Sequence, residues 1–182
     1  MPMAKVGIYG GSFNPVHFGH MGLAEWVLTH TDLDELWLMV TPNNPLKDSR
    51  ILADEHERLN GVREAISRLQ LPAGKRLVAS DFEFHLPRPS YTANTLRELR
   101  KAYPEHTFTL IIGEDNLAIF TRWREYQTIL DNHRVFVYPR HGTTDIPELQ
   151  PKPVFLVGAP YFDISSTQIR QQKEGVEHKN AK

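Results

Sequence analysis

The sequence of 182 residues contains no cysteine, which excludes disulfide bonds and thiolate metal sites. It also lacks an excess of one charge: 21 basic and 22 acidic side chains leave a formal net charge of −1, so the composition does not indicate general nucleic-acid binding. No apolar run is long enough to cross a membrane, and the first residues lack a basic-then-apolar signal segment. We therefore expect one cytoplasmic domain over residues 1–182, with the polar residues 173–182 as a frayed tail.

Short apolar runs instead alternate with longer amphipathic stretches. The predicted strands are Lys5–Tyr9, Leu36–Thr41, Arg76–Asp81, Thr107–Ile112, Arg134–Tyr138 and Val154–Val157. The predicted helices are His20–His30, Ala53–Leu69, Thr92–Tyr103, Tyr126–Asn132 and Ser166–Gln172. This alternation predicts a doubly wound α/β fold with a largely parallel sheet and helices on both faces. Ligands of such folds bind beyond the carboxyl ends of the strands.

The most informative segment follows the first predicted strand and runs from Gly10 to His20 as Gly-Gly-Ser-Phe-Asn-Pro-Val-His-Phe-Gly-His. We expect Gly10 and Gly11 to form a turn whose backbone N–H groups approach an anion closely. His17 and His20 stand three positions apart, so on a helix both rings face the same phosphate. As zinc ligands they do not fit, because the glutamate of a His-Glu-x-x-His helix is missing and the chain has no cysteine. We predict no protein-held metal.

The segment Gly10–His20 resembles the signature of nucleotidyltransferases with a His-x-Gly-His motif, whose sheet is Rossmann-like. Further segments resemble the nicotinate-mononucleotide adenylyltransferase family, namely Asn44–Lys47, Pro89–Thr92, Gly113–Leu117, Trp123 and Ile164–Arg170. This resemblance implies transfer of AMP from ATP to nicotinic acid mononucleotide, in NAD biosynthesis, with release of pyrophosphate. It also implies Mg²⁺ bound through the ATP phosphates. Alternatives are adenylation of nicotinamide mononucleotide or phosphopantetheine, and a nucleotide sensor without turnover.

The resemblance assigns two groups of residues to ATP. His20 is expected to donate to the α-phosphate and His17 to contact the phosphates, while the other expected ATP-binding residues are Gly10, Gly11, Ser12, Phe13, Gly113, Asp115, Ser165, Ser166, Thr167 and Arg170. The hydroxyls of residues 165–167 would otherwise simply cap a helix. Arg170 favours the phosphate role, because its planar fork suits phosphate oxygens. Asp115 follows the fourth predicted strand, where a carboxylate can accept hydrogen bonds from a ribose.

A third group is expected to bind the acceptor: Asn44, Lys47, Ser90, Tyr91, Thr92, Thr95, Trp123 and Arg140. Lys47 is the candidate for neutralising phosphate charge, although a lysine in a loop is ordinarily just solvated. The segment Ser90–Thr92 opens a predicted helix whose backbone donors suit a small carboxylate, or it only caps that helix. By resemblance Trp123 stacks on the pyridine ring. The alternative for Trp123 is surface packing.

The sequence departs from the family pattern in two places. Leu46 precedes Lys47, where many relatives carry a histidine. The chain also ends soon after the segment with Arg170, whereas relatives usually continue into an aromatic-containing segment and a helix. This second difference bears on the last helix and on a homo-oligomer interface, and it is the reason for keeping the sensor as an alternative.

Overall fold

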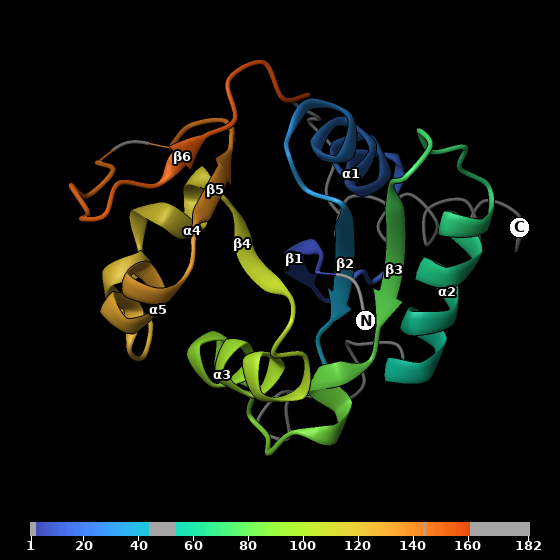
Figure 1. Cartoon of the computed structure of the whole chain (residues 1–182), viewed down its shortest axis with the longest axis horizontal. Coiled ribbons are helices and arrows are strands. Elements are labelled where there is room, and N and C mark those ends of the chain that lie inside the picture. Colours follow the sequence, from blue (N-terminus) through green and yellow to red (C-terminus); the bar gives the residue numbers. More distant parts are fainter. Residues whose placement is uncertain (1–2, 44–53, 144, 161–182) are drawn as a thin grey trace, which may run out of the picture.

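Six parallel strands form one sheet at the centre of the protein (Figure 1). The computed structural model describes residues 3–43, 54–143 and 145–160. Within them the strands are β1 (Lys5–Gly11), β2 (Glu35–Val40), β3 (Arg76–Ser80), β4 (Thr107–Gly113), β5 (Val135–Tyr138) and β6 (Val154–Phe155). Their order is β3-β2-β1-β4-β5-β6, and all neighbours are parallel. The predicted strands and the doubly wound arrangement are confirmed.

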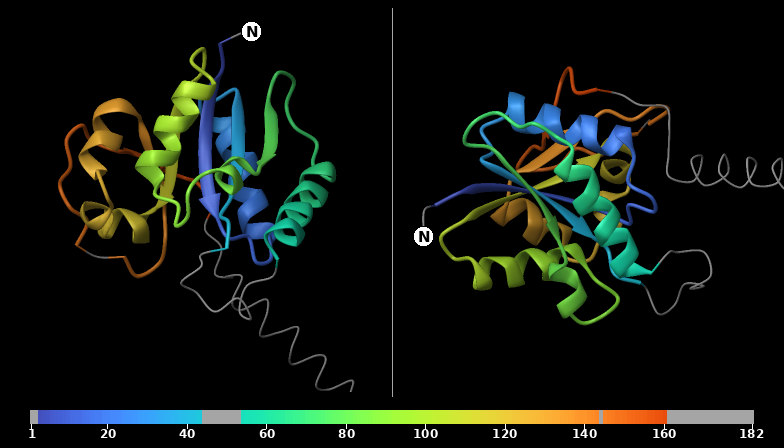
Figure 2. Two further views of the ribbon diagram at one scale, coloured as in Figure 1. Left: turned by 90° about the horizontal axis from the view of Figure 1, so that it is seen from below. Right: turned by 90° about the vertical axis from the view of Figure 1, so that its right-hand side faces the viewer.

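Helices cover both faces of this sheet. Over the same described residues they are α1 (Phe18–His30), α2 (Glu55–Ser67), α3 (Thr92–Ala102), α4 (Glu114–Ala118) and α5 (Tyr126–Asn132), with short 3-10 helices η1 (Phe82–His85) and η2 (Phe120–Arg122). Figure 2 shows α1 and α3 on opposite faces of the sheet. One buried cluster joins the sheet to α1 and α2, and a second joins it to α3, α4 and α5.

Strand β2 shows why the sheet needs both layers of helices. Leu36, Leu38 and Val40 belong to the cluster beneath α1 and α2, whereas Trp37 and Met39 belong to the cluster on the other face. Successive side chains of a strand point to opposite faces, so a continuous apolar run buries residues on both sides. Such a strand is stable only inside a three-layer arrangement.

The order of the strands places the first and fourth connections at the middle of the sheet. The chain moves outward from β1 to β2 and β3, then returns to place β4 on the other side of β1. The connections after β1 and β4 therefore leave the sheet in opposite directions. In the left view of Figure 2 the strands point downward toward these connections. Ligand sites of doubly wound sheets form at this switch point.

The structure corrects the interpretation of the paired glycines. Gly10 and Gly11 are not a turn but the last two residues of β1, where they pair with Met39 and Val40 of β2. The turn comes later, and Phe13 within it has a φ of 48°, in the left-handed region. The strand continues through both glycines because the backbone of β2 offers them the same hydrogen bonds as it would offer any other residue.

Two helices begin at other positions than expected. α1 begins at Phe18 with His17 as its N-cap residue, so the helix includes His20 in its first turn. α2 begins at Glu55 after an Asp54 cap whose side chain accepts from the His56 N–H. The predicted helix Ser166–Gln172 lies outside the described residues. No helix of the described ranges is long and apolar enough to cross a membrane.

Candidate active site

The connection between β1 and α1 folds back over the end of its own strand. The Phe13 side chain is only 2% exposed. A Cβ placed on Gly11 would lie 3.3 Å from Phe13 Cζ, so the glycine gives the aromatic ring room that a larger residue would crowd. Gly10 differs, because the nearest atom to such a Cβ would be the Met39 carbonyl oxygen at 4.0 Å. The backbone of Gly10 is therefore the one of the pair that is open to a ligand.

His17 and His20 form a capping box at the start of α1. The His17 Nδ1 accepts a hydrogen bond of 3.0 Å from the Gly19 N–H, and the His20 Nδ1 accepts one of 3.1 Å from the His17 N–H. The two rings are stacked, with centroids 3.7 Å apart. A neutral imidazole has one proton, so accepting at Nδ1 places that proton on Nε2. Both histidines thus hold an Nε2–H donor.

The surroundings of His20 keep its ring neutral. Burial lowers the pKa of His20 to about 3, with smaller contributions from His17 and Arg140. Much of that burial is aromatic: the Phe13 ring lies edge-on at 4.9 Å and the Tyr9 ring at 6.3 Å. Burial and Arg140 also lower the pKa of His17. At neutral pH the pair is uncharged, so each imidazole is a hydrogen-bond donor without the mutual repulsion of two cations.

Residues that follow β4 and β5 meet at the same edge of the sheet. A Cβ on Gly113 would lie 2.9 Å from the Tyr138 ring and 3.0 Å from Arg140 Cγ. The Arg140 guanidinium is 3.8 Å from the Asp115 carboxylate, and the Arg140 N–H donates to Glu114. The Tyr138 ring lies 5.8 Å from the Tyr9 ring, which lies 6.3 Å from the His20 ring, so Arg140 and Asp115 belong to the neighbourhood of the two histidines, and the charge of Arg140 lowers the pKa of both.

A separate cavity of about 270 Å³ opens at the start of α3. It is lined by Ser90, Tyr91, Thr92, Arg122, Trp123 and Arg124. The tertiary structure thus joins the predicted Ser90–Thr92 segment to the predicted Trp123 from a distant part of the chain. Arg124 lies over the Tyr91 ring, 3.9 Å from its centroid. Arg122 and Arg124 were not predicted from the sequence, although their positions on either side of Trp123 were the available signal.

The polar groups of this cavity suit a small anion. The Ser90 hydroxyl is buried and has no hydrogen-bond partner among the described residues. Tyr91 is the N-cap residue of α3, and its side chain makes no capping hydrogen bond. The first turn of a helix presents backbone N–H groups and the positive end of the helix dipole. With two arginines beside it, this helix start favours a carboxylate, and Trp123 adds an aromatic surface.

Thr95 lies below this cavity rather than in its wall. It is 2% exposed, and its hydroxyl is 2.6 Å from the Glu83 carboxylate and 3.2 Å from the Tyr91 carbonyl. Burial raises the pKa of Glu83, while the Thr95 hydroxyl opposes that rise. Through these contacts Thr95 stabilises the start of α3, and it is not among the residues that line the cavity.

Several predicted residues cannot be placed. Asn44, Lys47, Ser165, Ser166, Thr167 and Arg170 lie outside the described residues. No group of three or more His, Asp or Glu side chains that could hold a metal ion occurs in the part of the chain that the structure describes.

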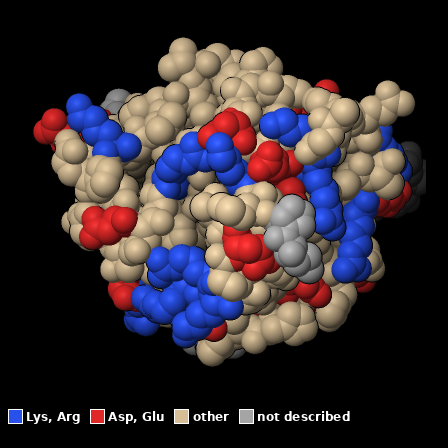
Figure 3. Space-filling model, viewed as in Figure 1, with Lys and Arg blue, Asp and Glu red and all other residues tan. Residues whose placement is uncertain are grey.

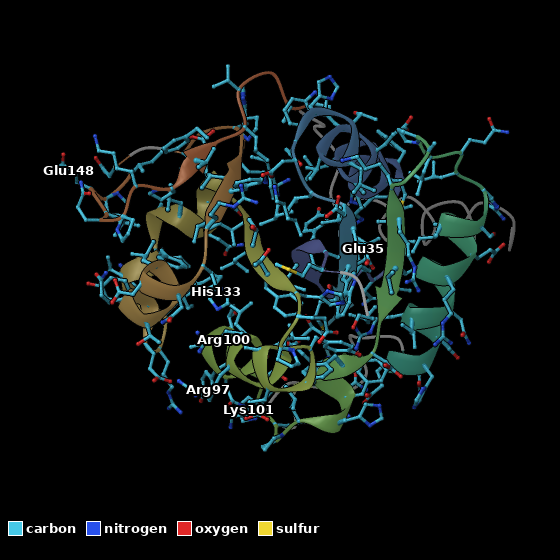
Figure 4. All side chains as sticks on the ribbon, in the orientation of Figure 1. Glu35, Arg97, Arg100, Lys101, His133 and Glu148 are labelled. Atoms are coloured by element: carbon cyan, nitrogen blue, oxygen red, sulfur yellow. The ribbon has the colours of Figure 1, made fainter. Side chains whose placement is uncertain are left out.

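A cluster of basic side chains lies at the other end of α3. Figure 4 labels Arg97, Arg100 and Lys101, which correspond to the large blue area at the lower left of Figure 3. Arg97 pairs with Glu125 at 2.9 Å and Lys101 with Glu98 at 3.1 Å. Arg100 and Lys101 stand in the last turn of the helix, where positive charge stabilises the dipole. This cluster has a structural explanation and is separate from the cavity.

Comparisons with known proteins show the family of the chain. A family model described as cytidylyltransferase-like matches residues 8–172. A "Probable nicotinate-nucleotide adenylyltransferase" of Bacteroides fragilis is 46% identical over 172 residues, covering 94% of this chain and 83% of the relative. One of the same description from Flavobacterium johnsoniae is 44% identical over 176 residues, covering 94% and 88%.

Solved structures show the same fold at lower identity. The nicotinic acid mononucleotide adenylyltransferase of Plasmodium falciparum, complexed with NaAD, superposes with a TM-score of 0.73 at 19% identity, covering 92% of this chain and 83% of that one. Its complex with APC gives 0.71 at the same identity and coverage. From the family model and the relatives of more than 40% identity, the chain belongs to the nicotinate-nucleotide adenylyltransferase family of the cytidylyltransferase-like proteins.

Proposed function

We propose that this protein transfers AMP from MgATP to nicotinic acid mononucleotide in the cytoplasm, producing nicotinic acid adenine dinucleotide and pyrophosphate. The observation that carries the proposal is the pair of neutral imidazoles at the switch point of the sheet. Their Nδ1 atoms are occupied by backbone N–H groups, which leaves two Nε2–H donors for phosphate oxygens. The curated relatives of more than 40% identity support the same activity.

The reaction needs donors and alignment more than acid or base catalysis. An oxygen of the acceptor phosphate attacks the α-phosphorus of ATP, and the bond from that phosphorus to the oxygen bridging the β-phosphate breaks. The electron pair leaves with pyrophosphate. A phosphate monoester has a second pKa near 6, so the attacking group is already largely ionised at neutral pH. Neutral histidines therefore suffice, because no proton has to be removed from the nucleophile.

We assign His20 to the α-phosphate. Its Nε2–H donates to a non-bridging oxygen, where negative charge builds up as the new bond forms. The donor is held in place by the His17 N–H at Nδ1 and by the Phe13 ring, so it needs no reorganisation during the reaction. His17 donates to a neighbouring phosphate oxygen. Gly10 stands at the end of β1, where a Cβ built on it meets no atom nearer than 4.0 Å, so its backbone is unobstructed.

Other ATP contacts rest on residues around this pair. We assign Asp115 to the ribose hydroxyls and Gly113 to the close approach of the nucleoside, with Arg140 beside them. The family resemblance supports Ser165, Ser166, Thr167 and Arg170 as further phosphate ligands and Lys47 with Asn44 at the acceptor phosphate. Mg²⁺ enters with ATP, held by the phosphates, and offsets their charge.

The cavity at the start of α3 is our site for the nicotinate ring. Trp123 offers its face to the ring, while the Ser90 hydroxyl, the first turn of α3 and Arg124 surround the carboxylate. A carboxamide carries no charge and turns an NH₂ group toward these donors. The acid is therefore the preferred acceptor over the amide.

The proposal is tested by measuring pyrophosphate release from MgATP with three separate acceptors. Nicotinic acid mononucleotide should give the highest kcat/KM, with its amide counterpart weaker and phosphopantetheine inactive. Highest activity with phosphopantetheine or with the amide would overturn the acceptor assignment. Absence of release with every acceptor, while ATP still binds, would favour a nucleotide sensor.

A further inference from the structure

Arg58 is a buried cation that the transfer chemistry above does not use. It stands in the first turn of α2 and is only 3% exposed. Positive charge is unfavourable at the start of a helix, where Glu55 and Glu57 suit the dipole, and arginine is rarely buried. A residue chosen for helix stability or for the apolar core would not be an arginine. Its position therefore points to what its guanidinium contacts.

The Arg58 guanidinium links the connections that follow two neighbouring strands. Its Nη1 donates to the Ser12 carbonyl at 2.7 Å, in the connection after β1. Its Nη2 donates to Asn43 Oδ1 at 2.9 Å, in the connection after β2. A planar fork with several fixed donors reaches both acceptors at once, whereas a lysine ammonium has no such geometry. The two connections are thereby held at a fixed separation.

Asn43 extends this linkage toward the cavity of α3. Its backbone hydrogen-bonds the Glu55 carboxyl, and its carbonyl lies 3.5 Å from Arg88 Nη1. Arg88 in turn forms a two-point pair with Glu55, at 2.6 and 2.8 Å. Arg88 is two residues from Ser90, which lines the cavity. A continuous chain of contacts thus runs from Ser12 to the edge of the proposed nicotinate site.

The other end of the linkage leads to the histidines. Ser12 precedes Phe13, whose buried ring lies 4.9 Å from the His20 ring. A displacement of the Ser12 carbonyl therefore moves the Phe13 ring, which packs against the His20 imidazole that carries the Nε2–H donor. In-line transfer needs the donor, the α-phosphate and the acceptor in one alignment, and an error of about 1 Å costs roughly 100-fold in rate.

We infer that Arg58 is a positioning residue of the transfer reaction, which sets the His17–His20 pair relative to the nicotinate cavity through Ser12 and Asn43. This inference rests on the proposed function for its reaction. Its role is indirect, because the described contacts of Arg58 are to the protein groups Ser12 and Asn43. It predicts that a change at Arg58 lowers turnover through alignment, with little loss of substrate binding.

The test compares Arg58→Lys and Arg58→Met with matched changes at Arg63, which is exposed on the same helix and whose hydrogen bond among the described residues is a 3.4 Å contact to Asn60. We expect Arg58→Lys to lower kcat about 10-fold or more, with each KM within about threefold. Arg58→Met should lower kcat further, because it removes both hydrogen bonds of the guanidinium. Arg63→Lys and Arg63→Met should keep the wild-type kcat.

Hydrogen exchange of residues 10–20 provides a readout that does not depend on turnover. It should be faster in Arg58→Lys than in Arg63→Lys. The inference is overturned if Arg58→Lys and Arg63→Lys have equal kcat per folded molecule, or equal exchange over residues 10–20. The acceptor assay on the wild type tests the proposed function independently of Arg58. If another acceptor proves to be the substrate, the proposed function is overturned, and the kcat values of the Arg58 and Arg63 variants are then compared with that acceptor.

Discussion

Replacing His20 in two ways separates its two roles. In wild type, Nδ1 accepts from the His17 N–H and Nε2–H is free to donate to phosphate. His20→Asn places an amide oxygen near the Nδ1 position and keeps the cap, but has no donor at the Nε2 position. His20→Ala removes both. We expect both variants to lose the same catalytic factor, about 100- to 1,000-fold in kcat, or roughly 3–4 kcal/mol of transition-state stabilisation.

The two variants should differ in stability. His20→Ala leaves the His17 N–H without its partner, and loss of an N-cap interaction costs about 1 kcal/mol. For a chain of this size, that free energy corresponds to a decrease in Tm of about 2–4 °C. His20→Asn should stay close to the wild-type Tm. Steady-state pyrophosphate release and thermal unfolding, measured on the same preparations, provide both numbers, together with a KM for ATP that changes only a few-fold in each variant.

Two results would refute this reasoning. Wild-type turnover in His20→Asn would mean that the Nε2–H donor is not used in the transition state. A KM for ATP that rises as much as kcat falls would mean that His20 binds the ground state equally well, so it would not be a catalytic donor.

Three further predictions concern the same site. The pKa of His20 is about 3 in the folded chain and near 6.5 in the unfolded chain, so on acidification the unfolded state binds a proton before the folded state does. The contribution of His20 to the free energy of unfolding should therefore be full above pH 6.5 and decrease as the pH falls toward 3. In urea titrations, the free energy of unfolding of His20→Asn should decrease less between pH 7.5 and 5 than that of the wild type. An identical decrease in both proteins would contradict the buried neutral ring. Trp123→Ala should raise the KM for nicotinic acid mononucleotide about 10-fold and leave that for ATP unchanged, because stacking on a base is worth about 1–3 kcal/mol; an unchanged acceptor KM would remove Trp123 from the site. Gly113→Ala should weaken ATP binding measured by calorimetry, since its Cβ would lie 2.9 Å from Tyr138 and 3.0 Å from Arg140, and unaltered ATP affinity would show that these side chains move aside at no cost.

Much of the fold was predictable because its signals are local. The apolar runs of β1 to β6 are properties of neighbouring residues, so all six strands of the described ranges were found. α4 has five residues and η2 has three. Elements of one turn have no periodicity to detect, and they were missed.

The candidate site was predictable only where its residues follow a strand or belong to a recognised motif. His17, His20, Ser90–Thr92 and Trp123 were selected in this way. Arg58 was not selected, because its function depends on acceptors 15 and 46 positions away in the sequence. Glu83 was missed for the same reason, since its partner Thr95 is 12 positions distant.

The sequence by itself determined the α/β alternation, the parallel doubly wound sheet and the family, since these follow from hydrophobic spacing, from the contiguous Gly10–His20 motif and from further short segments that resemble the family. Only the tertiary structure decided which nitrogen of each histidine donates, that Gly11 gives room to the Phe13 ring, and that Trp123 and its two neighbouring arginines meet Ser90–Thr92 at the start of α3. The physical reason is that these properties depend on hydrogen bonds, burial and contacts between segments that become neighbours only when the strands assemble in the order β3-β2-β1-β4-β5-β6.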